Sequence, residues 1–124
     1  MTKKYALCLS DESIKSLKKI AHFKTFSANT PLYYQGQTPI VAYFILRGHV
    51  LLLKGNKIYH EITKGCLIGY RELSLNIPSL FTAKALSETE IYYIDKSSLL
   101  EIKNSKSSGL RRLYTELTHL VPDT

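Results

Sequence analysis

The chain has 124 residues, a length typical of one domain with one hydrophobic core. Hydrophobic residues make up 44% and charged residues 22%, as in soluble globular proteins, and no apolar run approaches the roughly 18 residues of a membrane span. The formal net charge of +7 allows an acidic partner, but the 17 Lys and Arg residues are scattered, which favours an ordinary solvated surface.

The N-terminal segment does not indicate secretion. Lys3 and Lys4 precede an apolar run, YALCL, that is too short for a signal peptide, so we expect a cytoplasmic protein. Cys8 and Cys66 are the only cysteines, and one widely separated pair does not form a disulfide framework. No CxxC or Cys/His spacing predicts a metal site, so we interpret both cysteines as small apolar side chains.

A helix is predicted from about residue 11 to 22. Ser10 can serve as its N-cap, while Asp11 and Glu12 place negative charge in the first turn, where it complements the helix dipole. Apolar residues recur at helical spacing at Ile14, Leu17, Ile20 and Ala21. We expect an amphipathic helix with its lysines on the outer face.

The segment from about 26 to 95 has the pattern of many short strands. Apolar, β-prone runs alternate with turn residues; they are PLYY, VAYFIL, HVLLL, IYHEI, SLFTAKAL and EIYYI. KGNK between the third and fourth runs predicts a tight hairpin. Tyrosines on these strands are expected to be half-buried packing residues, although aromatics among lysines can also stack on single-stranded nucleic acid.

Two C-terminal helices are predicted, from about 97 to 104 and from about 108 to 120. Ser98 stands three residues before Glu101, the spacing of a capping box. The second helix carries an apolar stripe of Leu110, Leu113, Tyr114, Leu117, Leu120 and Val121. This stripe can form a short dimer seam or pack on the chain's own sheets, and the sequence favours neither.

This order of elements predicts one mainly β domain over residues 1–124. We expect an eight-stranded jelly-roll sandwich flanked by one N-terminal and two C-terminal helices. Scattered histidines and the lack of a nucleophile elbow, an HExxH motif or a P-loop argue against an enzyme.

The chain resembles the cyclic nucleotide-binding domain of the bacterial catabolite activator family and of the regulatory subunits of cyclic-AMP-dependent kinase. The resemblance covers about residues 20–115 and rests on PLYYQGQTPIVAYFILRGHVLLL and on four family glycines, Gly36, Gly48, Gly65 and Gly69. An earlier family glycine falls at Asn29, a residue that tolerates positive φ, and Gln37 replaces the Asp that usually follows the first of these glycines.

The segment IGYRELSLNIPSLFTAKA, residues 68–85, resembles the family's phosphate cassette. In the family, a Glu after the glycine binds the ribose 2′-hydroxyl and an Arg after the proline pairs with the cyclic phosphate. Backbone amides of the short helical turn between them complete the anion site. Here Gly69 and Pro78 keep the spacing, but Tyr70 replaces the Glu and Ser79, followed by Leu80, replaces the Arg.

These two replacements argue against the usual binding of cyclic AMP. Losing the Arg contact costs about 2–5 kcal/mol and losing the ribose acceptor about 1–3 kcal/mol, together about two to six decades in affinity. Tyr70 would also fill the ribose volume, or stack on another flat ligand. Arg71, Glu72 and Lys84 are either parts of a shifted cassette or ordinary surface charges.

Three functions remain open from the sequence. The first is a non-catalytic regulatory module with a degenerate site, which binds a protein partner or its own copy through the final helix. The second is a sensor of a cyclic (di)nucleotide or another anion through an altered cassette with Arg71, Ser79 and Lys84. The third is the sensor half of a transcription regulator; direct DNA binding is not expected, because the sequence ends at Thr124 without a helix-turn-helix. No resident cofactor or metal is expected, cyclic nucleotide being the conceivable ligand.

Overall fold

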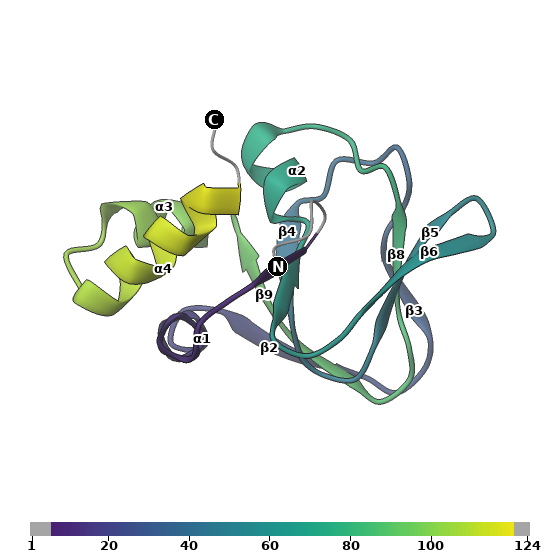
Figure 1. Ribbon diagram of the computed structural model, residues 1–124, viewed down its shortest axis with the longest axis horizontal. Coiled ribbons are helices and arrows are strands. Elements are labelled where there is room, and N and C mark those ends of the chain that lie inside the picture. Colours follow the sequence, from purple (N-terminus) through teal and green to yellow (C-terminus); the bar gives the residue numbers. More distant parts are fainter. Residues whose placement is uncertain (1–5, 121–124) are drawn as a thin grey trace.

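Two antiparallel sheets form the body of the protein in the computed structural model, which describes residues 6–120, with only the backbone for Leu120. The first elements are β1 (Ala6–Cys8), α1 (Asp11–Lys18), β2 (His22–Phe26), β3 (Thr30–Tyr33), β4 (Val41–Arg47), β5 (Val50–Lys54) and β6 (Lys57–Ile62). They are followed by β7 (Cys66–Ile68), α2 (Tyr70–Leu75), β8 (Thr82–Ala85), β9 (Thr89–Asp95), α3 (Lys96–Asn104) and α4 (Ser108–Leu120). Figure 1 shows α1, α3 and α4 together at one end and the β5–β6 hairpin at the other.

The sheets have the architecture of a jelly roll, as the sequence predicts. One sheet has the strand order β1-β7-β4-β9-β2 and the other the order β3-β8-β5-β6. The described chain therefore has nine strands rather than eight. The expected hairpin at KGNK is present, since Lys54 pairs with Lys57 and Gly55 has a positive φ of 62°. Among the described residues, no helix is long and apolar enough to cross a membrane.

The N-terminal elements differ from the prediction. Residues 6–8 form β1, which pairs with β7, although the sequence offered only a short apolar run there. α1 begins at the predicted N-cap Ser10, whose hydroxyl accepts from the Ser13 amide at 3.2 Å, but it ends at Lys18 rather than near 22. Pairing of His22 with Tyr93 draws the following residues into β2, so the sheet overrides the helical pattern.

Two local predictions are also wrong. α3 is capped by Asp95, whose carboxylate accepts from the Ser98 amide at 2.8 Å, so Ser98 is not the cap of a Ser98–Glu101 capping box. The hydrogen bonds from Ser98 hold the pKa of Asp95 below its ordinary value. Asn29 does not have a positive φ. Its side chain instead accepts a hydrogen bond from the Ser87 amide at 2.8 Å, which connects two turns.

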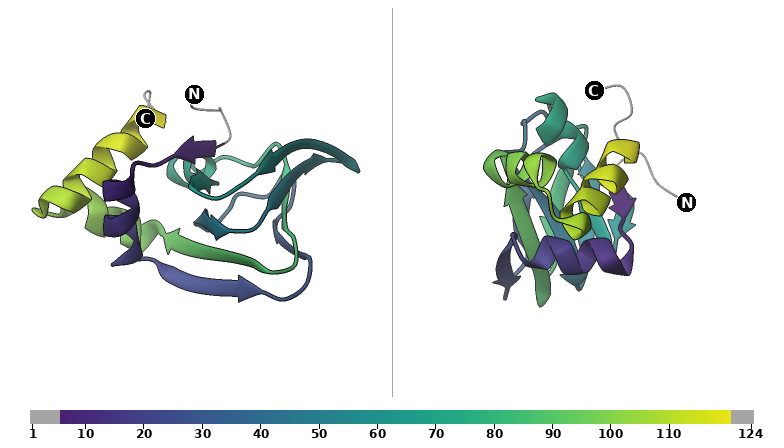
Figure 2. Two further views of the ribbon diagram at one scale, coloured as in Figure 1. Left: turned by 60° about the horizontal axis from the view of Figure 1, so that its bottom comes forward. Right: turned by 90° about the vertical axis from the view of Figure 1, so that its left-hand side faces the viewer.

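Buried side chains form two clusters, one on each side of the five-stranded sheet. The cluster between the sheets includes Phe26, Tyr33, Ile45, Val50, Leu52, Ile68, Phe81 and Ile91. The cluster under the helices includes Leu7, Leu17, Phe44, Leu67, Tyr70, Leu73, Ile94, Ile102, Leu113 and Leu117. Figure 2 shows the helices gathered beside this second face of the sheet.

The stripe on α4 packs on its own chain. Leu113 and Leu117 are 0% and 1% exposed, and Leu110 and Tyr114 are partly buried against the same cluster. The side chain of Leu120 and all of Val121 lie outside the described residues. The stripe could form a dimer seam or pack on its own chain; in the structure, Leu113 and Leu117 pack on their own chain.

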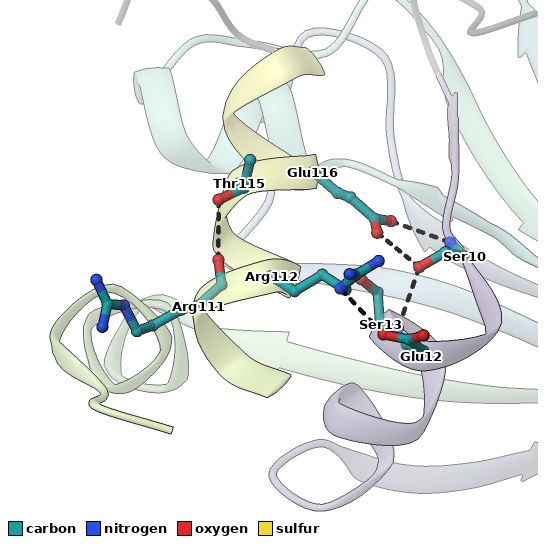
Figure 3. Close-up of polar contacts among 7 residues, drawn as sticks. All are labelled: Ser10, Glu12, Ser13, Arg111, Arg112, Thr115 and Glu116. Carbon is teal, nitrogen blue, oxygen red and sulfur yellow. Dashed lines mark hydrogen bonds and ion pairs between the residues drawn. The ribbon is translucent and has the colours of Figure 1, made fainter. Parts of the chain in front are cut away.

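Polar contacts fasten α4 to the start of α1 (Figure 3). The Glu116 carboxylate accepts from both the backbone amide of Ser10, at 3.0 Å, and its hydroxyl, at 2.6 Å. Desolvation works to raise the pKa of Glu116, but these hydrogen bonds outweigh it and hold the pKa below its usual value. Arg112 pairs with Glu12 at 3.0 Å, a contact between exposed side chains that adds little. The cap of α1 and the position of α4 thus depend on the same carboxylate.

Adding one methyl group to the turn between β4 and β5 should strongly reduce the stability of the protein. Gly48 has φ +99°, and a Cβ there would lie 2.5 Å from Thr89 Oγ1 and 2.7 Å from Thr89 Cα. Thr89 cannot easily retreat, because its hydroxyl both donates to the His49 carbonyl and accepts from the His49 amide. Gly48→Ala should therefore lower the free energy of unfolding by more than about 2 kcal/mol, measured by urea denaturation.

Gly36→Ala is the matched control. Gly36 also has a positive φ, +85°, but nothing lies within 4 Å of an added Cβ. Backbone strain alone should cost about 1–2 kcal/mol there. Equal losses in the two variants would show that the contact with Thr89 relaxes and does not constrain the turn.

Candidate functional site

The cassette begins as the family resemblance implies, with a glycine and a short helix. β7 leads into Gly69, whose φ of 79° places it in the left-handed region, and the Leu73 amide donates to the Gly69 carbonyl at 2.9 Å. α2 ends at Leu75, and its C-cap Asn76 is also left-handed, at φ 56°. A Cβ on Gly69 would lie 3.5 Å from Tyr33 Cε2, so the tyrosine ring packs directly beside the glycine.

Ser79, at the position of the phosphate-binding Arg, is used to close a turn. Its amide donates to the Gln37 carbonyl at 2.9 Å, and its carbonyl accepts from the Gly36 amide at 2.8 Å. Its hydroxyl donates to the Phe81 carbonyl at 2.7 Å and accepts from the Phe81 amide at 3.1 Å. Because Ser79 is 3% exposed, this residue is a structural link between the cassette and the β3–β4 loop.

Tyr33 occupies the interior of the roll beside these residues. The side chain is 5% exposed, and its ring stacks on that of Tyr43 with centroids 6.3 Å apart. Burial raises the pKa of the Tyr33 phenol above its ordinary value, and the Glu72 carboxyl raises it further, whereas a hydrogen bond with the Ser79 side chain opposes the shift. Tyr33, Glu72 and Ser79 are all buried, and the pKa of the Tyr33 phenol responds to both of the other two side chains.

Glu72 is a buried acid in the first turn of α2. It is 6% exposed, and burial raises the pKa of its carboxyl, while its own backbone amide and Arg71 oppose the rise. A cyclic phosphate bound near Tyr33 would thus lie near this carboxyl group, and it would lack the guanidinium that the resemblance implies at the position of Ser79.

Tyr70 lies on the other side of α2, contrary to the expectation that its ring fills the ribose volume. It belongs to the cluster under the helices, and the pKa of its phenol is raised by burial and then by the neighbouring Tyr114. A pocket of about 470 Å³ is found there; its lining residues are Tyr70, Leu73, Ser74, Lys96, Leu99, Leu100, Lys103, Tyr114 and Thr118. The residue at the family's Glu position therefore faces the C-terminal helices.

The other predicted site residues do not converge on Tyr33. Lys84 lies in β8 between Ala83 and Ala85, which are fully buried, so strand alternation places the lysine on the outer face of its sheet. Leu80 is 46% exposed, and Arg71 is half-buried next to Glu72. Of the candidates for a shifted cassette, only Glu72 thus lies beside the interior of the roll.

Comparison with known proteins identifies the family of the chain. A model of the family described as cyclic nucleotide-binding domain matches residues 23–106, more than half of the chain. The chain therefore belongs to the cyclic nucleotide-binding domain family. No curated protein sequence matches it.

Solved structures share the fold at low sequence identity. The catabolite activator protein of Thermus thermophilus is 20% identical with a TM-score of 0.68, over 92% of this chain and 52% of that one. A protein of a cyclic-GMP-dependent signalling pathway that regulates bacterial phytopathogenesis is 12% identical with a TM-score of 0.77, over 95% and 98%. The C-linker and homology domain of zELK channels, crystallised in the presence of cAMP, is 26% identical with a TM-score of 0.66, over 89% and 57%. The chain thus spans about half the length of the Thermus protein.

The buried carboxyl of Glu72 predicts a pH dependence of stability. Its pKa is raised above the ordinary 4.5, so the folded chain binds this proton more tightly than the unfolded chain does. The free energy of unfolding should fall as pH rises from 4.5 to the raised pKa, by at most about 1.4 kcal/mol per pH unit. Glu72→Gln should remove this decline, so the free energy of unfolding of the variant should rise relative to that of the wild type as pH increases.

Urea denaturation at several pH values measures the difference between the two proteins. Glu101→Gln serves as the control, because Glu101 is exposed on α3. A difference between Glu72→Gln and wild type that stays constant with pH would contradict a raised pKa at Glu72.

Proposed function

We propose that this chain is a non-catalytic regulatory domain whose nucleotide site is filled by its own side chains. The observation that carries the proposal is the Tyr33 ring, which is 5% exposed and packs beside Gly69 at the start of the cassette. The left-handed φ of Gly69 and the buried bonds of Ser79 give the cassette a structural role without a ligand. It then acts as part of the core.

The energetics oppose cyclic nucleotide binding in the usual mode. A nucleotide would have to displace Tyr33, which exposes apolar surface at a cost of about 1.5–3 kcal/mol for a side chain of this size. It would also lack the guanidinium partner, which is worth about 2–5 kcal/mol for a desolvated charge pair. The sum, about 3.5–8 kcal/mol, corresponds to about three to six decades in affinity.

Isothermal titration calorimetry of the chain with cyclic AMP and with cyclic GMP tests the proposal. We expect no binding for either nucleotide up to about millimolar concentration, because a site of about micromolar affinity would lose at least about three decades. A complex of about micromolar affinity whose chemical shift changes map to residues 69–84 would overturn it.

Two double variants separate the roles of Tyr33 and Tyr70. Tyr33→Ala with Ser79→Arg opens the interior and supplies the cation, while Glu72 remains as an acceptor, so weak binding of cyclic AMP should appear. Tyr70→Glu with Ser79→Arg restores the family's residues but leaves Tyr33 in place, so it should not bind. Binding by the second variant and not by the first would show that Tyr70, and not Tyr33, blocks the nucleotide site.

A filled site suits a domain that acts through a protein partner or a second copy. Self-association through Leu113 and Leu117 would require α4 to leave its own core, because both are buried there. Arg111 on α4 is exposed, whereas Arg112 pairs with Glu12 of α1. The exposed cation of Arg111 favours an acidic partner protein over a second copy.

A second candidate function is a sensor of a small anionic molecule, and the pocket beside Tyr70 favours it. Lys96 and Lys103 stand two turns apart on α3, and the phenols of Tyr70 and Tyr114 lie between α2 and α4. A flat apolar body with one acidic group would match this lining. The pocket joins the cassette helix to α4, so an occupant would act on both.

A thermal-shift screen of aromatic carboxylates and nucleoside monophosphates tests the sensor. A ligand at about 100 times its dissociation constant should raise the melting temperature by several degrees. Lys103→Glu should abolish the shift, whereas Lys106→Glu, an exposed lysine that does not line the pocket, should keep it. A shift lost equally in both variants would point to general charge and not to this pocket.

A further inference from the structure

The two cysteines, which the sequence separates widely, face each other across neighbouring strands. Cys8 of β1 and Cys66 of β7 are direct partners in the antiparallel register, and their Sγ atoms lie 2.8 Å apart. Both are thiols in the structure. The sequence alone predicts two small apolar side chains and reveals neither the exposure of Cys8 nor the contact of its sulfur with that of Cys66.

The backbone geometry suits a covalent link at this position. The Leu9 amide donates to the Gly65 carbonyl at 3.2 Å, so the next residue pair along the ladder is the hydrogen-bonded one. Hydrogen-bonded and non-hydrogen-bonded pairs alternate in an antiparallel ladder, which places Cys8 and Cys66 in a non-hydrogen-bonded pair. The Cα atoms of such pairs are about 4.5 Å apart, within the range of about 4.4–6.8 Å that disulfides span.

The pair is also accessible from solvent on one side. Cys8 is exposed and Cys66 is half-buried. Cys8 lies on the rim of a pocket of about 410 Å³ whose lining includes Lys18, Lys64 and Gly65. A small oxidant can thus reach the sulfur of Cys8 first, with Cys66 already in contact behind it.

We propose that Cys8 and Cys66 form a reversible intramolecular disulfide when the chain meets hydrogen peroxide. The Cys8 sulfur attacks one peroxide oxygen and becomes a sulfenic acid, and the O–O bond breaks with release of one water. The Cys66 sulfur then attacks the sulfenic sulfur, and the second water leaves as the S–S bond forms. The two thiols lose two electrons and two protons, which the peroxide takes up.

The bond would connect two parts of the structure that matter for the cassette. β7 runs directly into Gly69 and α2, while β1 runs through Leu9 into Ser10, which holds Glu116 of α4. A cross-link between β1 and β7 would restrain both the base of the cassette and the junction of α1 with α4. This inference is independent of which ligand or partner the domain binds.

Oxidation of the purified, fully reduced chain with a small excess of hydrogen peroxide tests the proposal. We expect titratable thiols to fall from two per chain to none. The intact mass should fall by that of two hydrogen atoms, the protein should stay monomeric on a non-reducing gel, and dithiothreitol should reverse these changes. The melting temperature of the oxidised chain should rise by on the order of 10 °C, because the link closes a long loop in the unfolded state.

Hydrogen exchange locates the effect, and single variants control it. Amides of residues 6–9 and 66–69 should exchange more slowly after oxidation, while those of the distant β5–β6 hairpin should not change. Cys8→Ser alters an exposed side chain and should fold normally, yet it should lose both the mass change and the thermal shift. Covalent dimers, or sulfinic acid at both cysteines without loss of two hydrogens, would overturn the proposal.

Discussion

The packing of the Tyr33 ring beside Gly69 is the contact on which the cassette depends. Gly69 is favoured by its own backbone, because φ is 79° there, while Tyr33 and the Val41 carbonyl pack at 3.5 Å from the position of a Cβ. Ser79 joins the same arrangement through Gln37 and Phe81. Features that bind an anion in the wider family here satisfy the chain's own polar groups, so their presence alone does not indicate a ligand.

Local signals predicted the parts of the fold that local energetics decide. The KGNK turn and the extent of α4 follow from turn chemistry and a 3.6-residue period, and the structure has both of them. β1 and the early end of α1 could not be predicted in this way. Three residues become a strand only because β7 lies beside them, and His22 leaves the helical pattern only because β9 offers a partner. These choices depend on contacts between distant residues, which periodicity does not encode.

The candidate site could also be predicted only in part. Tyr70 and Ser79 could be identified from the sequence as departures from the family pattern. The sequence could not show which way their side chains face. Tyr70 and Glu72 are about 200° apart around α2, so one faces the C-terminal helices and the other the roll; which of them does so is decided by packing. Tyr33 was predicted as a packing residue but missed as part of the site. The sequence PLYY does not reveal that Tyr33, opposite Ala83 after a register shift, reaches the cassette.

The position of α4 is also set by packing and hydrogen bonds within the chain. The family resemblance implies a final helix that moves when a ligand arrives, which requires that its two positions differ little in free energy. Here Leu113 and Leu117 are buried and Glu116 caps the start of α1, so the docked position is stabilised without any occupant in the roll. Undocking would expose two leucines and leave Ser10 without its acceptor. If Tyr33 fills the nucleotide site as proposed, a ligand at that site cannot offset this cost. A signal that moves α4 must therefore act on its contacts with α1, α2 or α3, where the pocket beside Tyr70 lies, or on β1, whose Cys8 precedes Ser10 by two residues.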